Sequence, residues 1–266
     1  MVKFLFTLLL IISYFNSIAQ VEHGTEIFYM QVGDSLFIGA DSKISHNDGL
    51  PPSTACKIFH YKSYVWAKAG LYNYYGKFSM DTIIENIIKK RISPKETFRQ
   101  IRKIACKKMN EVLPDISSHK INQSLSDSVP LTSTIIATFE NHHLIFEDAS
   151  YLNRNGEKGR IVKDSVLYTE KDIRPDEAFS DFFGSHELSK KFLDFLNTQA
   201  GRDKIRNVHF EVNDNPDFKL NSIENLVYYL IYVQTKTDSI NVGGPISVIL
   251  FDNAGYHWKY NDLHCP

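Results

Sequence analysis

Strand pairs joined by short turns alternate along this chain with pairs of amphipathic helices, and that order limits the folds it can adopt. A first hairpin is predicted from Glu26 to Ala40, with Gly33-Asp34 at its turn, because glycine at the first central position suits a type II′ turn. A second hairpin is expected around Lys62-Ser63, with its strand pattern ending at Gly70, and a terminal hairpin starts at Ile246. Further strands are expected at 133–140, 143–149 and 160–168.

Four helices are predicted from capping residues and from apolar residues three or four positions apart. Ser79 can cap the first, and Ser93-Pro94-Lys95-Glu96 is a capping box with proline at the first helical position of the second. Ser185 can cap the third, which Gly201 would end, and the fourth starts at Asn221. The apolar faces comprise Ile83, Ile84, Ile87 and Ile88; Phe98, Ile101, Ala105, Met109 and Val112; Leu188, Phe192 and Leu196; and Ile223, Leu226, Val227, Leu230 and Val233. The polar stretches 119–130 and 202–218 are expected to be loops, the second of them a loop or small insertion.

This order of elements predicts a single α/β (α+β) domain over residues 25–266. Two antiparallel sheets stacked face to face, each flanked by a helix pair, would bury all four apolar helix faces. The expected fold is therefore a four-layer αββα sandwich.

The N-terminus has the pattern of a secretory signal peptide over residues 1–19. Lys3 supplies a positive start, an apolar run extends from Phe4 to Ile12, and Ser17-Ile18-Ala19 places small residues at a cleavage site. An uncleaved membrane anchor is the alternative, but the run is shorter than the roughly 20 residues of a comfortable span. We expect a secreted or periplasmic protein with no membrane span after signal cleavage.

Composition excludes some classes of partner. The 266 residues carry a formal net charge of −1, so we expect no bulk attraction to nucleic acid or to anionic membranes. Cys56, Cys106 and Cys265 cannot all pair within one chain, and their pairing is left open, with a small buried hydrophobe as the favoured role of Cys56. There is no Cys/His metal spacing, and we expect neither a metal nor a cofactor.

The register of the first hairpin brings three polar residue types to one end of it. Counting back from the turn places Glu26 opposite Asp41 and Thr25 opposite Ser42. A hydroxyl, a carboxylate and the next cation, Lys43, then lie together. The alternative is that Asp and Lys simply mark a strand end.

Three segments resemble the start of proteasome β-type subunits, which are N-terminal-nucleophile (Ntn) hydrolases. They are 23–27 (HGTEI), 39–43 (GADSK) and 56–59 (CKIF), and they resemble the family's Gly-Thr processing junction, Ala-Asp-Ser-Arg segment and Lys-Ile-Phe segment. Asp41 is 16 residues after Thr25 and Lys57 is 32 residues after it, which are the intervals of the family's nucleophile, acid and lysine.

Later segments resemble the family more loosely. Gly70 corresponds to its oxyanion glycine, one residue early, and Gly184-Ser185 to the Gly-Ser before its third helix. Asp238 and Gly243-Gly244 correspond to the residues that precede its last strands. Lys43, Ser185 and Asp238 are therefore supporting candidates beside Thr25, Asp41, Lys57 and Gly70.

The resemblance implies a threonine-type hydrolase that cuts its own chain. Thr25 would be the nucleophile, with its own α-amino group, of ordinary pKa about 7.7 to 8.0, as the base. That group exists only after the Gly24–Thr25 bond breaks, so residues 20–24 would be a short propeptide. Lys57 would lower the pKa of the amine by like-charge repulsion, and Asp41 would orient Lys57. The Gly70 N–H would donate to the developing oxyanion, which would stabilise the transition state by about 3 kcal/mol.

Three departures from the family pattern keep other functions open. Glu26 replaces the small hydroxyl residue usual after the nucleophile, and Asn241 stands where the family has its second serine. His186 also follows Ser185 where the family often has glycine. The first hypothesis is an exported hydrolase of peptide or amide bonds. For its assembly we expect a small homo-oligomer or an open ring. The second is a non-catalytic relative that serves as a binding or assembly module.

Overall fold

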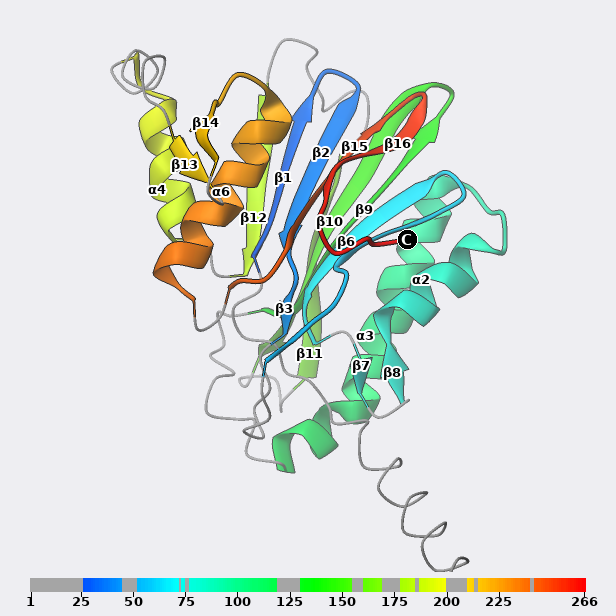
Figure 1. Cartoon of the computed structure of the whole chain (residues 1–266). Coiled ribbons are helices and arrows are strands. Elements are labelled where there is room, and N and C mark those ends of the chain that lie inside the picture. The colour runs from blue at the N-terminus through cyan, green and yellow to red at the C-terminus, as the bar shows by residue number, and fades with distance from the viewer. Residues whose placement is uncertain are drawn as a thin grey trace, which may run out of the picture.

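The computed structural model describes residues 26–44, 52–71, 73–74, 77–118, 130–154, 160–168, 178–184, 187–199, 210–212, 215–239 and 242–266 (Figure 1). Two five-stranded antiparallel sheets dominate this part of the chain. In spatial order, the first sheet contains β12 (Ala178–Gly184), β1 (Glu26–Val32), β2 (Ser35–Asp41), β15 (Ile246–Asp252) and β16 (Gly255–Asn261). The second contains β11 (Arg160–Tyr168), β10 (His143–Arg154), β9 (Pro130–Glu140), β6 (Tyr64–Gly70) and β5 (Ile58–Tyr61).

Four helices and three two-stranded pairs complete the described part. The helices are α2 (Met80–Ile88), α3 (Pro94–Ser118), α4 (Glu187–Leu196) and α6 (Ile223–Thr237). The small pairs are β3 (Lys43–Ile44) with β4 (Ser53–Thr54), β7 (Asn73–Tyr74) with β8 (Phe78–Ser79), and β13 (Phe210–Val212) with β14 (Asn215–Phe218).

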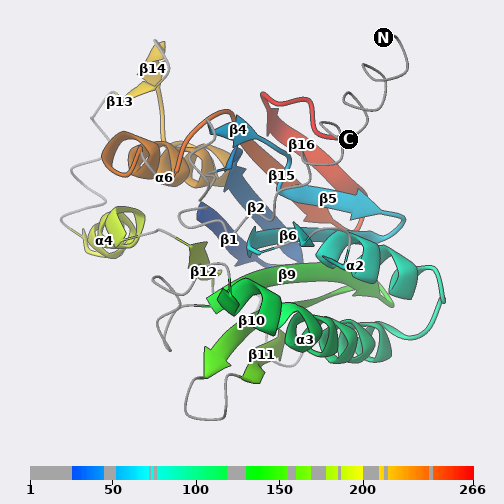
Figure 2. The ribbon, with the colours of Figure 1, turned by 90° about the horizontal axis from the view of Figure 1, so that it is seen from below.

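Three buried apolar clusters define the layers. Side chains of both sheets, among them Ile27, Ile38, Val65 and Ile135, form the middle cluster, so the sheets are stacked face to face. A second cluster joins α2 and α3 to the outer face of the second sheet, and a third joins α6 to the outer face of the first sheet, with Phe192 of α4 packed against it. Figure 2 shows the two helix pairs on opposite sides of the stacked sheets. The predicted αββα sandwich is confirmed.

The first hairpin has the predicted register. Val32 pairs with Ser35, and the pairing continues to Ile27 opposite Ala40. Gly33 has a φ of +56°, a conformation that glycine adopts without a steric penalty. Because the side chains of a strand alternate between its faces, this register decides which residues face the second sheet and which face α6.

The helix starts predicted at Ser79 and Ser93 are also confirmed. The Ser79 hydroxyl accepts a hydrogen bond from the Thr82 N–H at 3.3 Å, and Ser93 accepts one from the Glu96 N–H at 3.4 Å. The face of α3 expected to be apolar is buried, with none of its five residues more than 2% exposed. Helix identity and orientation therefore followed from local capping and periodicity.

Other elements differ from the expectation or cannot be compared with it. Strand β12 was not predicted, and β10 extends to Arg154, five residues past the expected end. The stretch expected to be a loop or insertion at 202–218 contains the β13–β14 pair. Residues 119–129 of the loop expected over 119–130, the cap Ser185 and the terminator Gly201 lie outside the described residues, whereas Pro130 is the first residue of β9.

Candidate functional site

Asp41 ends β2 and is fully enclosed by hydrogen-bond donors. Its Oδ1 accepts the Glu26 N–H at 3.0 Å, and its Oδ2 accepts the N–H groups of Lys43 at 3.2 Å and Gly243 at 3.0 Å. The fourth donor is the Lys57 ammonium, 3.0 Å from Oδ1. The side chain is 0% exposed, and this carboxylate is held in one orientation by Lys43 of its own segment and by groups from three other segments of the chain.

Lys57 reaches this carboxylate from the other sheet. It directly precedes β5, and its side chain is only 2% exposed. Its Nζ also donates to the Lys43 carbonyl oxygen at 2.6 Å. The Asp41–Lys57 ion pair therefore links the end of the first sheet to the start of the second.

Burial raises the pKa of Asp41, and the nearby Lys57 charge and the N–H donors oppose that rise. A buried carboxylate without such partners would be far less stable as an anion. The arrangement supplies a cation held at a defined point by a carboxylate and a carbonyl.

A glycine turn beyond α6 completes the enclosure. The Val242 N–H donates to the Asp238 carbonyl at 2.8 Å, and the Gly243 carbonyl accepts the N–H groups of Ser42 at 3.2 Å and Lys43 at 2.9 Å. Gly244 has a φ of +73°, and a Cβ there would lie 2.6 Å from the Ser42 hydroxyl. The turn approaches the end of β2 so closely that a side chain at Gly244 does not fit.

The supporting candidates Lys43 and Asp238 reach this centre mainly through their backbone. Lys43 gives its N–H to Asp41 and its carbonyl to Lys57, while its Nζ donates to the Ser239 carbonyl. Asp238 ends α6 and accepts the bond that sets the glycine turn. The sequence singled out the side chains of Lys43 and Asp238. In the structure it is mainly their backbone groups that hold Asp41, Lys57 and the glycine turn in place.

Gly70 ends β6 in a conformation that only glycine tolerates well. Its φ is +84°, and a Cβ would lie 2.3 Å from the Leu131 carbonyl oxygen, which accepts the Leu71 N–H at 2.8 Å. The role of the Gly70 N–H as an oxyanion donor remains a prediction.

The structure therefore brings Asp41, Lys57 and Lys43 together, with Asp238 behind the adjoining turn. The predicted nucleophile Thr25, the processing residue Gly24 and Ser185 lie outside the described residues. Glu26, the residue after Thr25, is described, and its N–H contacts Asp41.

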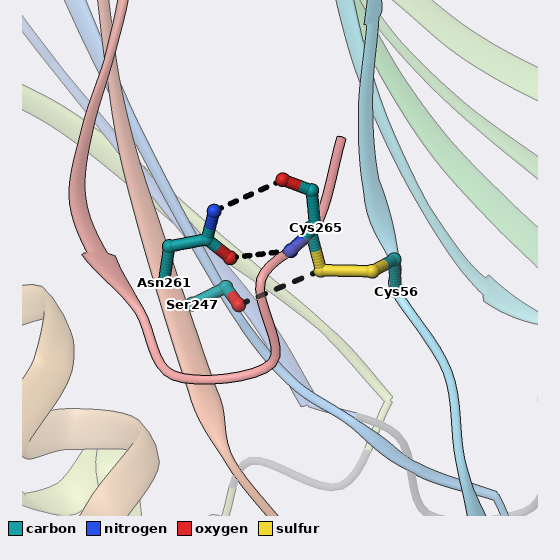
Figure 3. Close-up of a disulfide and its surroundings, with 4 residues drawn as sticks. All are labelled: Cys56, Ser247, Asn261 and Cys265. Carbon is teal, nitrogen blue, oxygen red and sulfur yellow. Dashed lines mark hydrogen bonds between the residues drawn. A yellow bond between two sulfur atoms is a disulfide. The ribbon is translucent and has the colours of Figure 1, made fainter.

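The favoured role of Cys56 as a simple buried hydrophobe was wrong. Cys56 forms a disulfide with Cys265, with a Cα–Cα separation of 5.6 Å (Figure 3). Cys106 is a free thiol. Three cysteines left the choice of pair open, because Cys56 and Cys265 are 209 positions apart in the sequence and carry no local signal of contact. Only the stacking of the sheets brings the two positions together.

A groove of about 510 Å³ lies beside the centre. Its walls come from β4, the end of α6 and the glycine turn, and include Lys43, Thr54, Tyr232, Lys236 and Gly243. Lys43 and Gly243 also contact Asp41, so the groove and the buried ion pair share a wall.

Within the described ranges, no group of three or more His, Cys, Asp or Glu side chains is placed to hold a metal ion. None of the helices in those ranges combines the length and apolar character that crossing a bilayer requires.

The sequence matches no protein-family model and none of the curated proteins. Among solved structures, one similar to this chain is a Gly-1 mutant of Anbu from Hyphomicrobium sp. strain MC1. The two are 14% identical, with a TM-score of 0.48, and the match covers 90% of this chain and 88% of that one.

Proposed function

We propose that this chain is an exported threonine-type hydrolase that cleaves peptide or amide bonds, with Thr25 as its nucleophile. The observation that carries the proposal is the buried Asp41–Lys57 pair, in which Asp41 also accepts the N–H of the residue after Thr25. A nucleophile at position 25 is joined by its own peptide bond to the nitrogen that contacts Asp41. The lysine of the pair supplies the nearby positive charge that this chemistry needs.

The first step of the proposed mechanism is self-cleavage. The Thr25 hydroxyl attacks the Gly24 carbonyl carbon, the Gly24–Thr25 C–N bond breaks, and the nitrogen takes a proton. Water then hydrolyses the ester, which leaves Thr25 with a free α-amino group. Gly24 favours the attack because it has no Cβ to obstruct the approach.

In the mature enzyme the α-amino group of Thr25 takes the proton of its own hydroxyl. The Lys57 ammonium keeps the pKa of that amine low enough for it to act as a base near neutral pH. The Gly70 N–H receives the developing oxyanion, and the groove beside the pair gives an extended or small substrate a place to lie.

Export is supported by an observation independent of the N-terminal pattern. The Cys56–Cys265 disulfide is a kind of bond that persists in oxidising compartments and is rare in the cytosol. We therefore propose a secreted or periplasmic location, tested by fractionation of cells that express the full chain.

The deciding experiment is the N-terminal sequence and intact mass of the purified exported protein. We expect the mature chain to begin at Thr25, the Thr25→Ala variant to keep residues 20–24, and the conservative Thr25→Ser variant to process. A wild-type protein that begins at Gln20 and stays so through long incubation would contradict the proposal. Glu26, which is 0% exposed where the family has a small hydroxyl residue, would then favour a non-catalytic binding module.

A further inference from the structure

Two links between the sheets lie side by side at the candidate centre. One is the Asp41–Lys57 ion pair, and the other is the Cys56–Cys265 disulfide. Cys56 and Lys57 are consecutive residues at the entry to β5, so the covalent link is attached to the backbone that carries the lysine.

Cys265 is itself fixed to the first sheet. Asn261, the last residue of β16, accepts the Cys265 N–H at 2.6 Å and donates from Nδ2 to the Cys265 carbonyl at 2.9 Å. The Ser247 hydroxyl of β15 lies 3.9 Å from the Cys265 sulfur (Figure 3). The disulfide therefore ties Cys56 to two adjacent strands of the first sheet.

These anchoring strands also define the position of Asp41. Ser247 pairs with Ala40, and the preceding residue, Ile246, pairs with Asp41 itself. The covalent link and the carboxylate consequently share one frame, and a shift of Cys265 relative to Asp41 would have to distort the β2–β15 pairing.

The chain before β5 is also linked to the end of β2 by backbone pairing, since Thr54 pairs with Lys43, but this pairing ends before Cys56. The Ala55 N–H donates to the Ser42 carbonyl at 2.9 Å, while the Lys57 carbonyl accepts the Lys68 N–H of its own sheet at 3.2 Å. A lysine side chain is long and flexible, so its ammonium stays at one point only when its backbone is held.

We propose that the Cys56–Cys265 disulfide is a positioning element for Lys57, and that its reduction slows catalysis by freeing the lysine from Asp41 and the Lys43 carbonyl. The link to catalysis rests on the proposed function. In the reduction, an added dithiol supplies two electrons and two protons and closes to its own disulfide, while Cys56 and Cys265 become thiols.

The first test reads the position of Lys57 without any activity measurement. The full-length exported protein is treated with an amine-acylating reagent in its oxidised form, after dithiothreitol, and as the Cys56→Ser/Cys265→Ser double variant. Acylation of each lysine is followed by peptide mass spectrometry. We expect Lys57 to be protected in the oxidised protein and labelled at least tenfold faster in the other two forms.

Lys68 is the internal control, because it is equally buried at 2% exposure but faces α2 instead of the first sheet. It should stay protected in all three forms, and Cys106→Ser should behave as the wild type. The Tyr256→Ala variant removes a different contact between β5 and β16, in which the rings of Tyr256 and His60 are stacked with their centroids 3.6 Å apart. It should leave Lys57 protected. The proposal would be overturned if reduction raised the labelling rates of Lys57 and Lys68 equally, or if it raised neither rate.

The second test measures turnover of a peptide or amide substrate in the same forms. We expect kcat to fall about tenfold or more on reduction, with KM little changed and with recovery on reoxidation of the wild type, since small misplacements of catalytic groups cost up to about 10²-fold. Full turnover by the reduced protein would refute the positioning role. Absence of turnover in every form, together with selective labelling of Lys57, would reject the proposed hydrolase while leaving the positioning of Lys57 supported.

Discussion

Two lysine–aspartate pairs with buried lysines lie next to each other in this fold, and only one of them belongs to the candidate site. Lys57 pairs with Asp41 and Lys68 with Asp81, and each lysine side chain is 2% exposed. Their backbones are direct neighbours, since the Lys68 N–H donates to the Lys57 carbonyl. Burial of the lysine therefore does not distinguish the candidate site from a structural contact.

The surroundings of the carboxylates make the difference. Asp81 lies in the first turn of α2, is 25% exposed, and accepts the Trp66 indole N–H at 3.0 Å. Lys68 also lies over the Phe59 ring, 4.4 Å from its centroid, so this pair fastens a helix to the outer face of one sheet. Asp41 instead accepts three backbone N–H groups where both sheets end, beside a groove.

The strongest test of this comparison is the loss of each lysine. Lys57→Ala should lower hydrolysis by about a thousandfold or more, because residues that act together in one catalytic unit show losses of that order. Lys68→Ala, assayed well below its melting temperature, should stay within about twofold of the wild type. Steady-state kinetics of both variants decide, and equal losses would show that the two pairs do not differ in function.

The loss of Lys68 should instead appear in stability. Lys68→Ala leaves Asp81 without its cation and removes the packing of the lysine stem, at a cost of about 2–3 kcal/mol, below the range for a fully buried pair because Asp81 is partly exposed. Lys68→Met, which keeps the apolar stem, should lose less than half as much. Urea denaturation gives both values, and a more stable Lys68→Ala variant would rule out the role of this pair in holding α2.

The sequence predicted one member of this comparison and not the other, for a physical reason. The hairpin register depends on counting within strands, and the structure reproduces the part of that register that it describes. The place of Lys57 beside Asp41 was expected only from the resemblance of its spacing to proteasome β-type subunits. The Lys68–Asp81 contact depends on how a helix settles on a sheet, and 13 residues with a turn between them fix no such geometry.

Contacts between distant segments were inaccessible to sequence reasoning in the same way. Gly243 donates to Asp41 across 202 residues, and Cys265 joins Cys56 across 209. Caps, helix faces and hairpins are local and were predicted, whereas β12 adds to an edge of the first sheet through long-range pairing that has no local signature. The residue types of the candidate site could therefore be predicted from the sequence. Its enclosure could not, because it depends on how the two sheets stack.

A smaller effect concerns the charge of Asp41. Because burial raises its pKa, the folded protein binds a proton more readily than the unfolded chain between pH 3.8 and the folded value. Stability linked to this group thus falls as the pH rises through that window, by at most about 1.4 kcal/mol per pH unit. Asp41→Asn should remove this slope, so its stability relative to the wild type should rise from pH 4 to pH 6 in urea titrations. A relative stability that declines with pH would mean that Lys57 and the N–H donors outweigh burial.

The smallest effect is expected at an exposed ion pair, in contrast to the two pairs whose lysines are buried. Glu96, in the first turn of α3, accepts hydrogen bonds from Arg99 at 2.6 and 2.5 Å and from Gln100 at 2.8 Å, and these contacts lower its pKa to about 2. A lowered pKa means that the stabilisation is complete above the ordinary value of 4.5 and is lost as the pH falls toward 2. Glu96→Gln should therefore be slightly less stable than the wild type at pH 7 and equal to it near pH 2.

In 1 M salt, where the screening length is about 3 Å, the difference in stability between Glu96→Gln and the wild type at pH 7 should shrink, whereas the cost of Lys68→Ala should not. Urea denaturation at both salt concentrations checks this, and a salt-insensitive Glu96→Gln difference would show that the carboxylate acts through the α3 cap and not through its charge.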